Sequence, residues 1–170
     1  EEPVAQPVAH RALSQALGAG ADDRAVAAPV LTGAGEHFCS GGSLPGLQEF
    51  QTKPRAAIVE RIGVLNELVR SMRQFPKPIV GAVNGAAAGA GMSLALACDI
   101  VLAGESASFL QAFTRIGLVP DCGSTWFLPR MVGDVRARAM AVCRPASASR
   151  SACSTAAAAL RSSCSRRASA

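Results

Sequence analysis

The chain has 170 residues, enough for one domain with a substantial hydrophobic core, and 49% of them are hydrophobic. Its formal net charge of +5 comes entirely from residues 143–170, which hold five arginines and no acid. Because residues 1–142 carry twelve basic and twelve acidic side chains, the body of the chain is neutral, which excludes nucleic acid as a main partner.

The first part of the chain predicts two helices separated by a strand and a loop. We expect the end of an amphipathic helix at residues 10–18, a buried strand at 27–32 and a loop at 33–46. Apolar residues at helical spacing predict a second helix at 56–74, which ends before two prolines.

The apolar run at residues 79–96 predicts a strand, a tight turn and a buried helix. A membrane-spanning helix of this length is the alternative. The run is rich in Ala and Gly, however, and the Asn84-Gly85 pair near its front is a turn signal. We therefore expect a strand at 79–83, a turn from Gly85, a helix at 89–97 and no membrane segment.

Shorter elements are predicted downstream. They are a strand at 100–103, a short strand and turn at 107–113, a loop at 117–123 and a helix at 124–132. Strands that alternate with helices predict an α/β fold.

Residues 143–170 differ in character from the rest. They contain nine Ala, eight Ser, five Arg and three Cys, with Leu160 as their one large aliphatic residue. Such a low-complexity tail cannot bury an apolar face and is expected to be disordered. We hypothesise a frameshift near Cys143, because this composition is typical of a GC-rich gene translated out of frame; a natural low-complexity tail is the alternative. The domain prediction is therefore a core at 1–142 and a tail at 143–170.

The cysteines and the chain start bear on compartment and metal binding. Six Cys are present, without a CxxC pair and without a His at metal spacing, so no zinc site is predicted. Three of them lie in apolar or Gly-rich segments and are expected to be small buried hydrophobes, which fits a reducing cytoplasm. No signal peptide is visible at the Glu-Glu-Pro start, and because the chain has no initial Met we expect the sequence to begin within a gene.

Two glycine-rich turns are the strongest chemical signal. They are Phe38-Cys39-Ser40-Gly41-Gly42 and the segment from Asn84 to Gly91. A dinucleotide-binding fingerprint would need a third Gly after Gly33-Ala34-Gly35, but Phe38 stands at that position. No Lys-Ser or Lys-Thr pair follows a glycine run, so a P-loop is excluded as well. The second turn leads into a helix whose N-terminus favours negative charge. Two N–H donors aimed at one point would form an oxyanion hole, although glycines at such junctions also serve packing or turning.

These segments carry a family resemblance over roughly residues 10–142. The stretch from Val80 to Ile100 resembles the signature of the enoyl-CoA hydratase/isomerase (crotonase) family, and Leu31 to Gly42 resembles its first active-site loop. The resemblance implies the crotonase spiral, an α/β fold of repeated strand–strand–helix units. We expect it to be incomplete at both ends, without the opening strands and the C-terminal helices.

The resemblance also implies a binding site for an acyl-coenzyme A thioester. The N–H groups of Gly42 and Ala90 would form the oxyanion hole. Ser40 would lie where the backbone contacts the adenine end of coenzyme A. The implied coenzyme A-binding residues are Phe38, Ser40, Gly41 and Leu44. Ser43 replaces the Asp usual after this loop, and we expect the change to loosen the loop.

Carboxylate positions divide the family by reaction. The two glutamates of hydratases fall on Ser93 and Phe113, and neither residue can act as a general base. The acid of isomerases falls on Asp121, whose pKa should be raised in an apolar pocket so that it could shuttle a proton. The alternative for Asp121 is a cap on the helix that begins near Ser124. Asp99 is interpreted as structural.

The segment at 106–130 most resembles the epoxyphenylacetyl-CoA isomerase branch of phenylacetate catabolism. The resemblance implies an isomerase without metal or redox cofactor that assembles as a trimer or hexamer. A hydratase, an acyl-CoA hydrolase and a non-catalytic fragment or coenzyme A-binding remnant are the alternatives. His10 and His37 are expected on the surface, with contact to ligand phosphates as the alternative for His37. Trp126 and Phe127 are expected in the core or the acyl-pocket wall.

Overall fold

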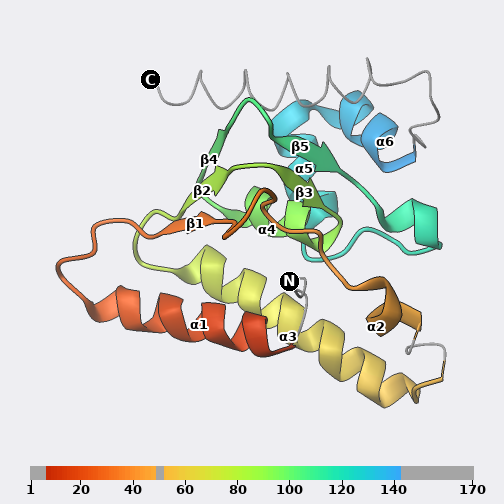
Figure 1. The fold of residues 1–170 in the computed structure, drawn as a ribbon, viewed down its shortest axis with the longest axis horizontal. Helices are drawn as coiled ribbons and strands as arrows, with labels where there is room; N and C mark the ends of the chain where they lie inside the picture. The colour runs from red at the N-terminus through yellow and green to blue at the C-terminus, as the bar shows by residue number, and fades with distance from the viewer. Residues whose placement is uncertain (1–6, 49–51, 143–170) are drawn as a thin grey trace.

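The computed structural model describes residues 7–48 and 52–142. The tail at 143–170 and its hypothesised frameshift lie outside the described residues. Helices and strands alternate along the chain, as predicted (Figure 1). The elements are α1 (Pro7–Asp22), β1 (Val30–Thr32), α2 (Leu44–Gln48), α3 (Arg55–Gln74), β2 (Val80–Val83), β3 (Ala86–Ala88), α4 (Ala90–Ala97), β4 (Ile100–Ala103), β5 (Ser108–Leu110), the 3₁₀ turn η2 (Phe113–Ile116), α5 (Ser124–Val132) and α6 (Asp134–Val142).

Two small parallel sheets organise these elements. One has the strand order β1-β2-β4, with Val80 of β2 opposite both Val30 and Ile100, and the other pairs β3 with β5. The chain passes from β2 to β3 and then into α4, and it repeats the step from β4 to β5 and then toward α5. This is the repeated strand–strand–helix unit predicted from the sequence.

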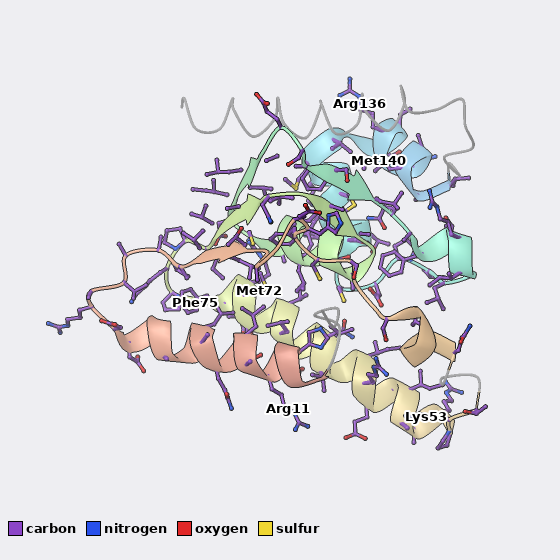
Figure 2. All side chains as sticks on the ribbon, viewed as in Figure 1. Arg11, Lys53, Met72, Phe75, Arg136 and Met140 are labelled. Carbon is purple, nitrogen blue, oxygen red and sulfur yellow. The ribbon has the colours of Figure 1, made fainter. Side chains whose placement is uncertain are left out.

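Helices pack around the sheets and close the core. In Figure 1, α1 and α3 lie side by side along one side of the molecule, and α5 and α6 lie on the opposite side. Met72 of α3 and Phe75 just after it point toward the sheet, whereas Arg11 and Arg136 point outward (Figure 2).

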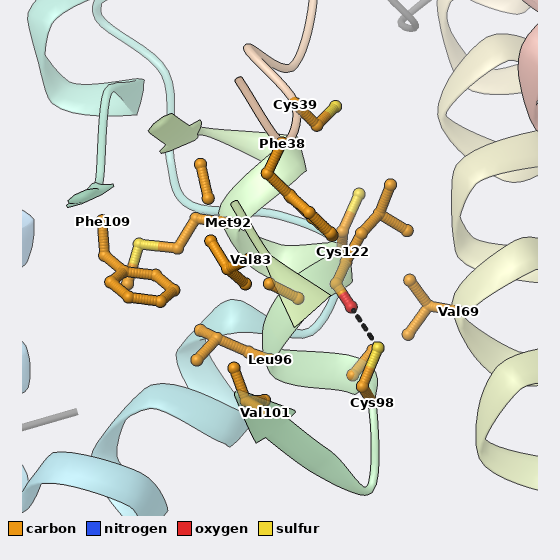
Figure 3. Close-up of a cluster of buried hydrophobic side chains, with 14 of the residues drawn as sticks. Phe38, Cys39, Val69, Val83, Met92, Leu96, Cys98, Val101, Phe109 and Cys122 are labelled. Carbon is orange, nitrogen blue, oxygen red and sulfur yellow. Dashed lines mark hydrogen bonds between the residues drawn. The ribbon is translucent and has the colours of Figure 1, made fainter. Parts of the chain in front are cut away.

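Helix α4 lies at the centre of the core. Every residue from Gly91 to Ala97 is buried. Figure 3 shows Met92 and Leu96 of this helix gathered with Val83 of β2 and Phe109 of β5. Because most side chains of α4 are small, neighbouring strands can approach its backbone closely.

The apolar run at 79–96 is divided among β2, β3 and α4, which confirms the prediction of strand, turn and helix. Within the described part of the chain, no helix is both long enough and apolar enough to cross a membrane. The turn nevertheless contains an additional strand. Ala86–Ala88 pairs with β5, although alanine favours helices over strands, because the register Ala87↔Phe109 buries both side chains.

Other expectations need correction. The strand predicted at 27–32 begins only at Val30, and that side chain is 63% exposed rather than buried, since β1 is an edge strand of its sheet. The loop predicted to reach residue 46 ends where α2 begins at Leu44, and α6 was not predicted. His10 is buried, not at the surface, and burial together with the nearby Arg61 charge lowers its pKa.

Candidate active site

The two glycine-rich turns are paired through their main chains. The N–H groups of Phe38 and Cys39 donate to the Ala86 carbonyl at 3.0 and 3.1 Å, and the Ala88 N–H donates to the Cys39 carbonyl at 2.9 Å. Cys39 and Ala87 form an isolated parallel bridge. The first turn is therefore an extension of the β3–β5 sheet, which fixes its distance from the second turn.

Glycines allow the closest part of this contact. Gly41 has a φ of +84°, and a Cβ atom on it would lie 2.8 Å from the Ala88 carbonyl oxygen and 3.1 Å from the Ala90 nitrogen. A Cβ atom on Gly91 would lie 2.2 Å from the Cys39 carbonyl oxygen. Side chains at these two positions would push the turns apart, so the sequence needs glycine at both.

Asn84 fastens the loop that leads into the first turn. Its Oδ1 accepts the Gly33 N–H at 3.1 Å, and its Nδ2 donates to the Gly35 carbonyl at 2.6 Å. A Cβ atom on Gly85 would lie 1.9 Å from the Glu36 carbonyl oxygen, so the two segments touch here as well. The sequence marked Asn84-Gly85 only as a turn signal, and the side-chain role of Asn84 was missed.

The first turn of α4 faces this junction. Ala90 is the first residue of α4, and the N–H groups of a first helical turn have no partner within the helix. Gly89 before it has a φ of +51° and supplies no side-chain cap. Gly41 lies against the Ala90 nitrogen at this end of α4. Because the N–H groups there lack partners within the helix, the space beside the first turn of α4 favours negative charge.

The remaining residues of the first turn differ in exposure and lead into α2. Phe38 and Gly41 are buried, and Ser40 and Gly42 are exposed. Leu44 begins α2, and the Ser43 hydroxyl oxygen accepts the Gly46 N–H at 3.2 Å. Ser43 therefore caps α2 at the end of the loop.

Asp121 lies in the loop before α5 and is half-buried. Among the described residues its Oδ1 is buried without a hydrogen-bond partner. Burial raises the pKa of Asp121, while hydrogen bonds from the Cys122 thiol and from its own main chain act in the opposite direction. The direction agrees with the sequence prediction. The cap alternative finds no support, because α5 starts after Gly123 without a side-chain cap and the Ser124 N–H bonds the main-chain oxygen of Asp121.

Ser93 joins the Asp121 loop to the start of α4. The residue is fully buried. Its hydroxyl oxygen lies 3.1 Å from the Asp121 carbonyl oxygen and 3.3 Å from the Gly89 carbonyl oxygen, so its proton is shared between the two acceptors. The structure therefore brings Asp121 to the helix turn that Ala90 begins. Sequence reasoning noted Ser93 only as a position without an acid.

Comparison with known proteins decides the family. The sequence profile described as enoyl-CoA hydratase/isomerase matches residues 8–152. The chain belongs to the enoyl-CoA hydratase/isomerase family, which is the crotonase superfamily.

Curated relatives in this family carry both kinds of reaction name. The chain is 45% identical over 136 residues to 1,2-epoxyphenylacetyl-CoA isomerase of Escherichia coli K12, a match that covers 78% of this chain and 51% of the relative. It is 50% identical over 113 residues to a protein named probable enoyl-CoA hydratase from Rhodobacter capsulatus, covering 66% and 43%. The chain thus spans about half the length of the curated relatives it matches.

Solved structures of the family show the same fold. An enoyl-CoA hydratase from Polaromonas sp. JS666 superposes with a TM-score of 0.76 at 39% identity, over 79% of this chain and 52% of that one. The predicted crotonase spiral is therefore confirmed for the part of the fold that this chain contains.

Two of three aromatic residues pack near the glycines Gly89 and Gly123. Phe113, where sequence comparison expected a hydratase glutamate, is buried, and its Cζ lies 3.9 Å from where a Cβ atom on Gly89 would be. Phe127 packs partly buried against the core, with its Cε2 atom 2.7 Å from a Cβ position on Gly123. Trp126 is 59% exposed and stacks with the Arg130 guanidinium, so a place in the core is wrong, while a place in the acyl-pocket wall stays a prediction.

Other candidate residues have structural or surface positions. Asp99 accepts the Ile79 N–H at 2.9 Å and pairs with Arg73 at 2.8 Å, which confirms its structural role. His37 is exposed, as expected. The described cysteines, Cys39, Cys98 and Cys122, are free and buried, also as expected.

No group of three or more His, Cys, Asp or Glu side chains that could hold a metal ion occurs within residues 7–48 and 52–142.

Proposed function

We propose that this protein isomerises an acyl-coenzyme A thioester. The N–H groups of Gly42 and Ala90 hold the thioester oxygen and stabilise the enolate that forms when a proton is lost. Asp121 removes that proton and returns it to another carbon. Enoyl-CoA and epoxyphenylacetyl-CoA are the proposed substrate classes, the second suggested by the name of the Escherichia coli relative.

The observation that carries this proposal is the placement of Asp121. Its Oδ1 is buried and unpartnered among the described residues, and its main chain is bonded to Ser93 in the first turns of α4. A carboxylate in such surroundings gains basicity, because burial raises its pKa. General bases work best when their pKa approaches the operating pH.

The oxyanion hole rests on the contact between the two turns. Gly41 packs against the Ala90 nitrogen, and Gly42 follows it directly in the chain. Small residues on both sides let a thioester oxygen approach main-chain N–H groups. One such donor contributes about 3 kcal/mol to transition-state stabilisation.

Isomerisation is favoured over hydration by the residues around Gly89. Activation of water in the expected hydratase manner needs two carboxylates, but one position holds the Ser93 hydroxyl and the other the Phe113 ring. The ring brings apolar surface to the turn where the enolate would form. A single acid, Asp121, suits removal and return of a proton better than addition of water.

The remaining features of the proposal concern binding and assembly. Coenzyme A would arrive as part of the substrate, and the reaction needs no metal or redox cofactor. The proposed contacts to coenzyme A are Phe38, Ser40, Gly41 and Leu44. We further propose a homotrimer or hexamer in the cytoplasm, which size-exclusion chromatography and cell fractionation would test.

A kinetic comparison of two aspartate variants tests the proposal. The 170-residue chain should convert 3-enoyl-CoA to the conjugated 2-enoyl isomer. Asp121→Asn should lower kcat by at least about 100-fold, since the amide cannot accept the proton. Asp22→Asn, an exposed position at the end of α1, should leave kcat unchanged. Equal turnover by wild type and Asp121→Asn would exclude Asp121 as the base.

Binding of acyl-CoA without turnover would favour the non-catalytic alternative, a coenzyme A-binding remnant. Titration with an acyl-CoA, followed by calorimetry, detects binding independently of chemistry. A wild-type chain that binds acyl-CoA but leaves every acyl-CoA tested unchanged would be a coenzyme A-binding remnant.

A further inference from the structure

We infer that Ser93 is a positioning residue that fixes the Asp121 loop against the first turn of α4. The inference rests on the proposed function, because it assigns the geometry of the proton transfer to a side chain that does not touch the substrate. Ser93 would then have a structural role in the proposed reaction, in addition to replacing the glutamate that hydratases have at this position.

The two acceptors of the Ser93 hydroxyl lie at the two parts of the site that must be held together. One is the Gly89 carbonyl, which directly precedes Ala90, and the other is the Asp121 carbonyl. The contact to Asp121 is the shorter, at 3.1 Å against 3.3 Å. A single buried hydroxyl therefore spans from the proposed oxyanion turn to the proposed base.

Ser93 is the one polar side chain of α4, and its hydroxyl needs a hydrogen-bond acceptor because it is buried. The sequence of α4 is otherwise formed of Ala, Gly, Met and Leu, and Ser93 has no exposed surface. Burial of a hydroxyl costs free energy unless it is hydrogen-bonded. The bond to Gly89 lies within the same helix and would satisfy the hydroxyl alone, so the bond to Asp121 is the one that adds tertiary order.

The Asp121 loop has a backbone that needs such support. Cys122 has a φ of +51°, an uncommon value for a residue other than glycine, and Gly123 follows with +77°. Strained conformations of this kind persist when the surrounding structure holds them. The Asp121 carbonyl accepts both the Ser93 hydroxyl and the Ser124 N–H, the latter at 3.0 Å, so two bonds fix the peptide just before the strained residue.

Removal of the Ser93 hydroxyl should thus displace Asp121 without disturbing coenzyme A binding. Proton transfer is sensitive to placement, and a misplacement of about 1 Å can cost about 100-fold in rate. Ser93→Ala should lower kcat by about 10- to 100-fold and leave KM within about twofold. In an Asp121→Asn background it should have no further effect on kcat, because a positioning residue acts only through the residue it positions.

Two matched variants separate positioning from packing. Ser93→Thr keeps the hydroxyl, which in a helix can still reach the carbonyl four residues earlier, and should recover at least half of the wild-type kcat. Ser124→Ala removes another buried hydroxyl, at the first residue of α5 directly after the loop, and that hydroxyl has no partner among the described residues. It should leave kcat within about twofold of wild type.

A measurement without substrate decides the inference even where the proposed function fails. Amide hydrogen exchange at Ser124, whose N–H donates to the Asp121 carbonyl, should become at least about tenfold faster in Ser93→Ala and stay unchanged in Ser93→Thr. The pKa of the Asp121 carboxyl, followed by carbon NMR, should fall toward its ordinary value in Ser93→Ala as the loop opens to water.

The outcomes are distinguishable. A wild-type chain without isomerase activity contradicts the proposed function. In that case, faster amide exchange at Ser124 and a lowered Asp121 pKa in Ser93→Ala still support the inference that Ser93 fixes the Asp121 loop. An active wild type with Ser93→Ala turnover within twofold of it overturns the inference and leaves the proposed function standing. Unchanged Ser124 exchange in Ser93→Ala overturns the inference in either case.

Discussion

The two halves of the site are built in different ways. The paired glycine-rich turns, residues 38–42 and 84–91, are held by main-chain bonds and by backbone contacts that only glycine permits, and the Asn84 side chain holds the loop that leads into the first turn. The loop at 117–123 has a strained Cys122, exposed Leu118 and Val119, and a buried Asp121 oxygen without a partner among the described residues.

This difference indicates which part of the site tolerates substitutions without loss of stability. The paired turns are fixed by many contacts that depend on backbone geometry, so a small change there should cost much stability. The Asp121 loop depends on few bonds and holds polar atoms that are not satisfied by the described residues. Changes there should cost little stability and act on chemistry instead.

The largest effect is expected from crowding of the paired turns. Gly85→Ala would place a Cβ atom 1.9 Å from the Glu36 carbonyl oxygen, which cannot move aside without displacing the loop. We expect a loss of at least about 3 kcal/mol in the free energy of unfolding, measured by urea denaturation. Gly35→Ala is the matched control, because its Cβ would meet nothing within 4 Å, and it should change stability by less than about 1 kcal/mol. Equal behaviour of the two variants would contradict the close contact of the turns.

Loss of the Asn84 side chain should be the next largest effect. Asn84→Ala leaves the Gly33 N–H and the Gly35 carbonyl without their partner. Each such hydrogen bond contributes about 0.5–1.5 kcal/mol to stability, so we expect a loss of about 2 kcal/mol in urea unfolding. Acyl-CoA affinity should fall together with stability, since the loop leads into the first turn. A variant as stable as wild type would show that the main chain alone holds the loop.

A pH-dependent effect is expected in the Asp121 loop. Because burial raises the pKa of Asp121, the folded chain holds this proton more tightly than the unfolded chain does. The stabilising contribution of Asp121 is therefore fully present below its ordinary pKa and is lost as the pH rises through the folded value. Asp121→Asn should gain stability relative to wild type at pH 7 and lose that advantage near pH 4, in urea melts at both pH values. A constant difference between these pH values would contradict burial of the carboxyl.

The smallest effect is expected at Gln111. Both polar atoms of its buried amide lack hydrogen-bond partners among the described residues. Replacement of an unsatisfied buried amide by an apolar side chain of similar size is nearly neutral or stabilising, so Gln111→Leu should change the unfolding free energy by no more than about 1 kcal/mol. A strong loss in thermal or urea unfolding would mean that the amide has a partner in the folded chain.

The sequence predicted the turns better than the loop, for physical reasons. Glycine spacing and helical periodicity are local, so both turns, α3 and α4 could be expected. The strand Ala86–Ala88 was missed because alanine carries no strand preference and only the pairing with β5 defines it. The surface prediction for His10 and the core prediction for Trp126 were wrong because burial depends on which helix face a residue occupies.

In the candidate site, too, features carried by the family resemblance were predicted and contacts between distant residues were not. Family resemblance led to Asp121, and a raised pKa there was foreseen. The Ser93 bond to Asp121 joins residues 28 positions apart, so no local pattern could have indicated it. The hydrogen bonds of the Asn84 side chain to Gly33 and Gly35 are equally non-local, because Asn84 and Gly33 are 51 residues apart in the sequence.

The mass of the product tests the central claim most directly. The chain is incubated separately with 3-enoyl-CoA and 2-enoyl-CoA, and the acyl-CoA products are separated by liquid chromatography against isomer standards and analysed by mass spectrometry. We predict a 2-enoyl isomer of unchanged mass from the first substrate and no water adduct from the second. A product heavier by one water, or release of free coenzyme A, would contradict isomerisation and favour a hydratase or a hydrolase.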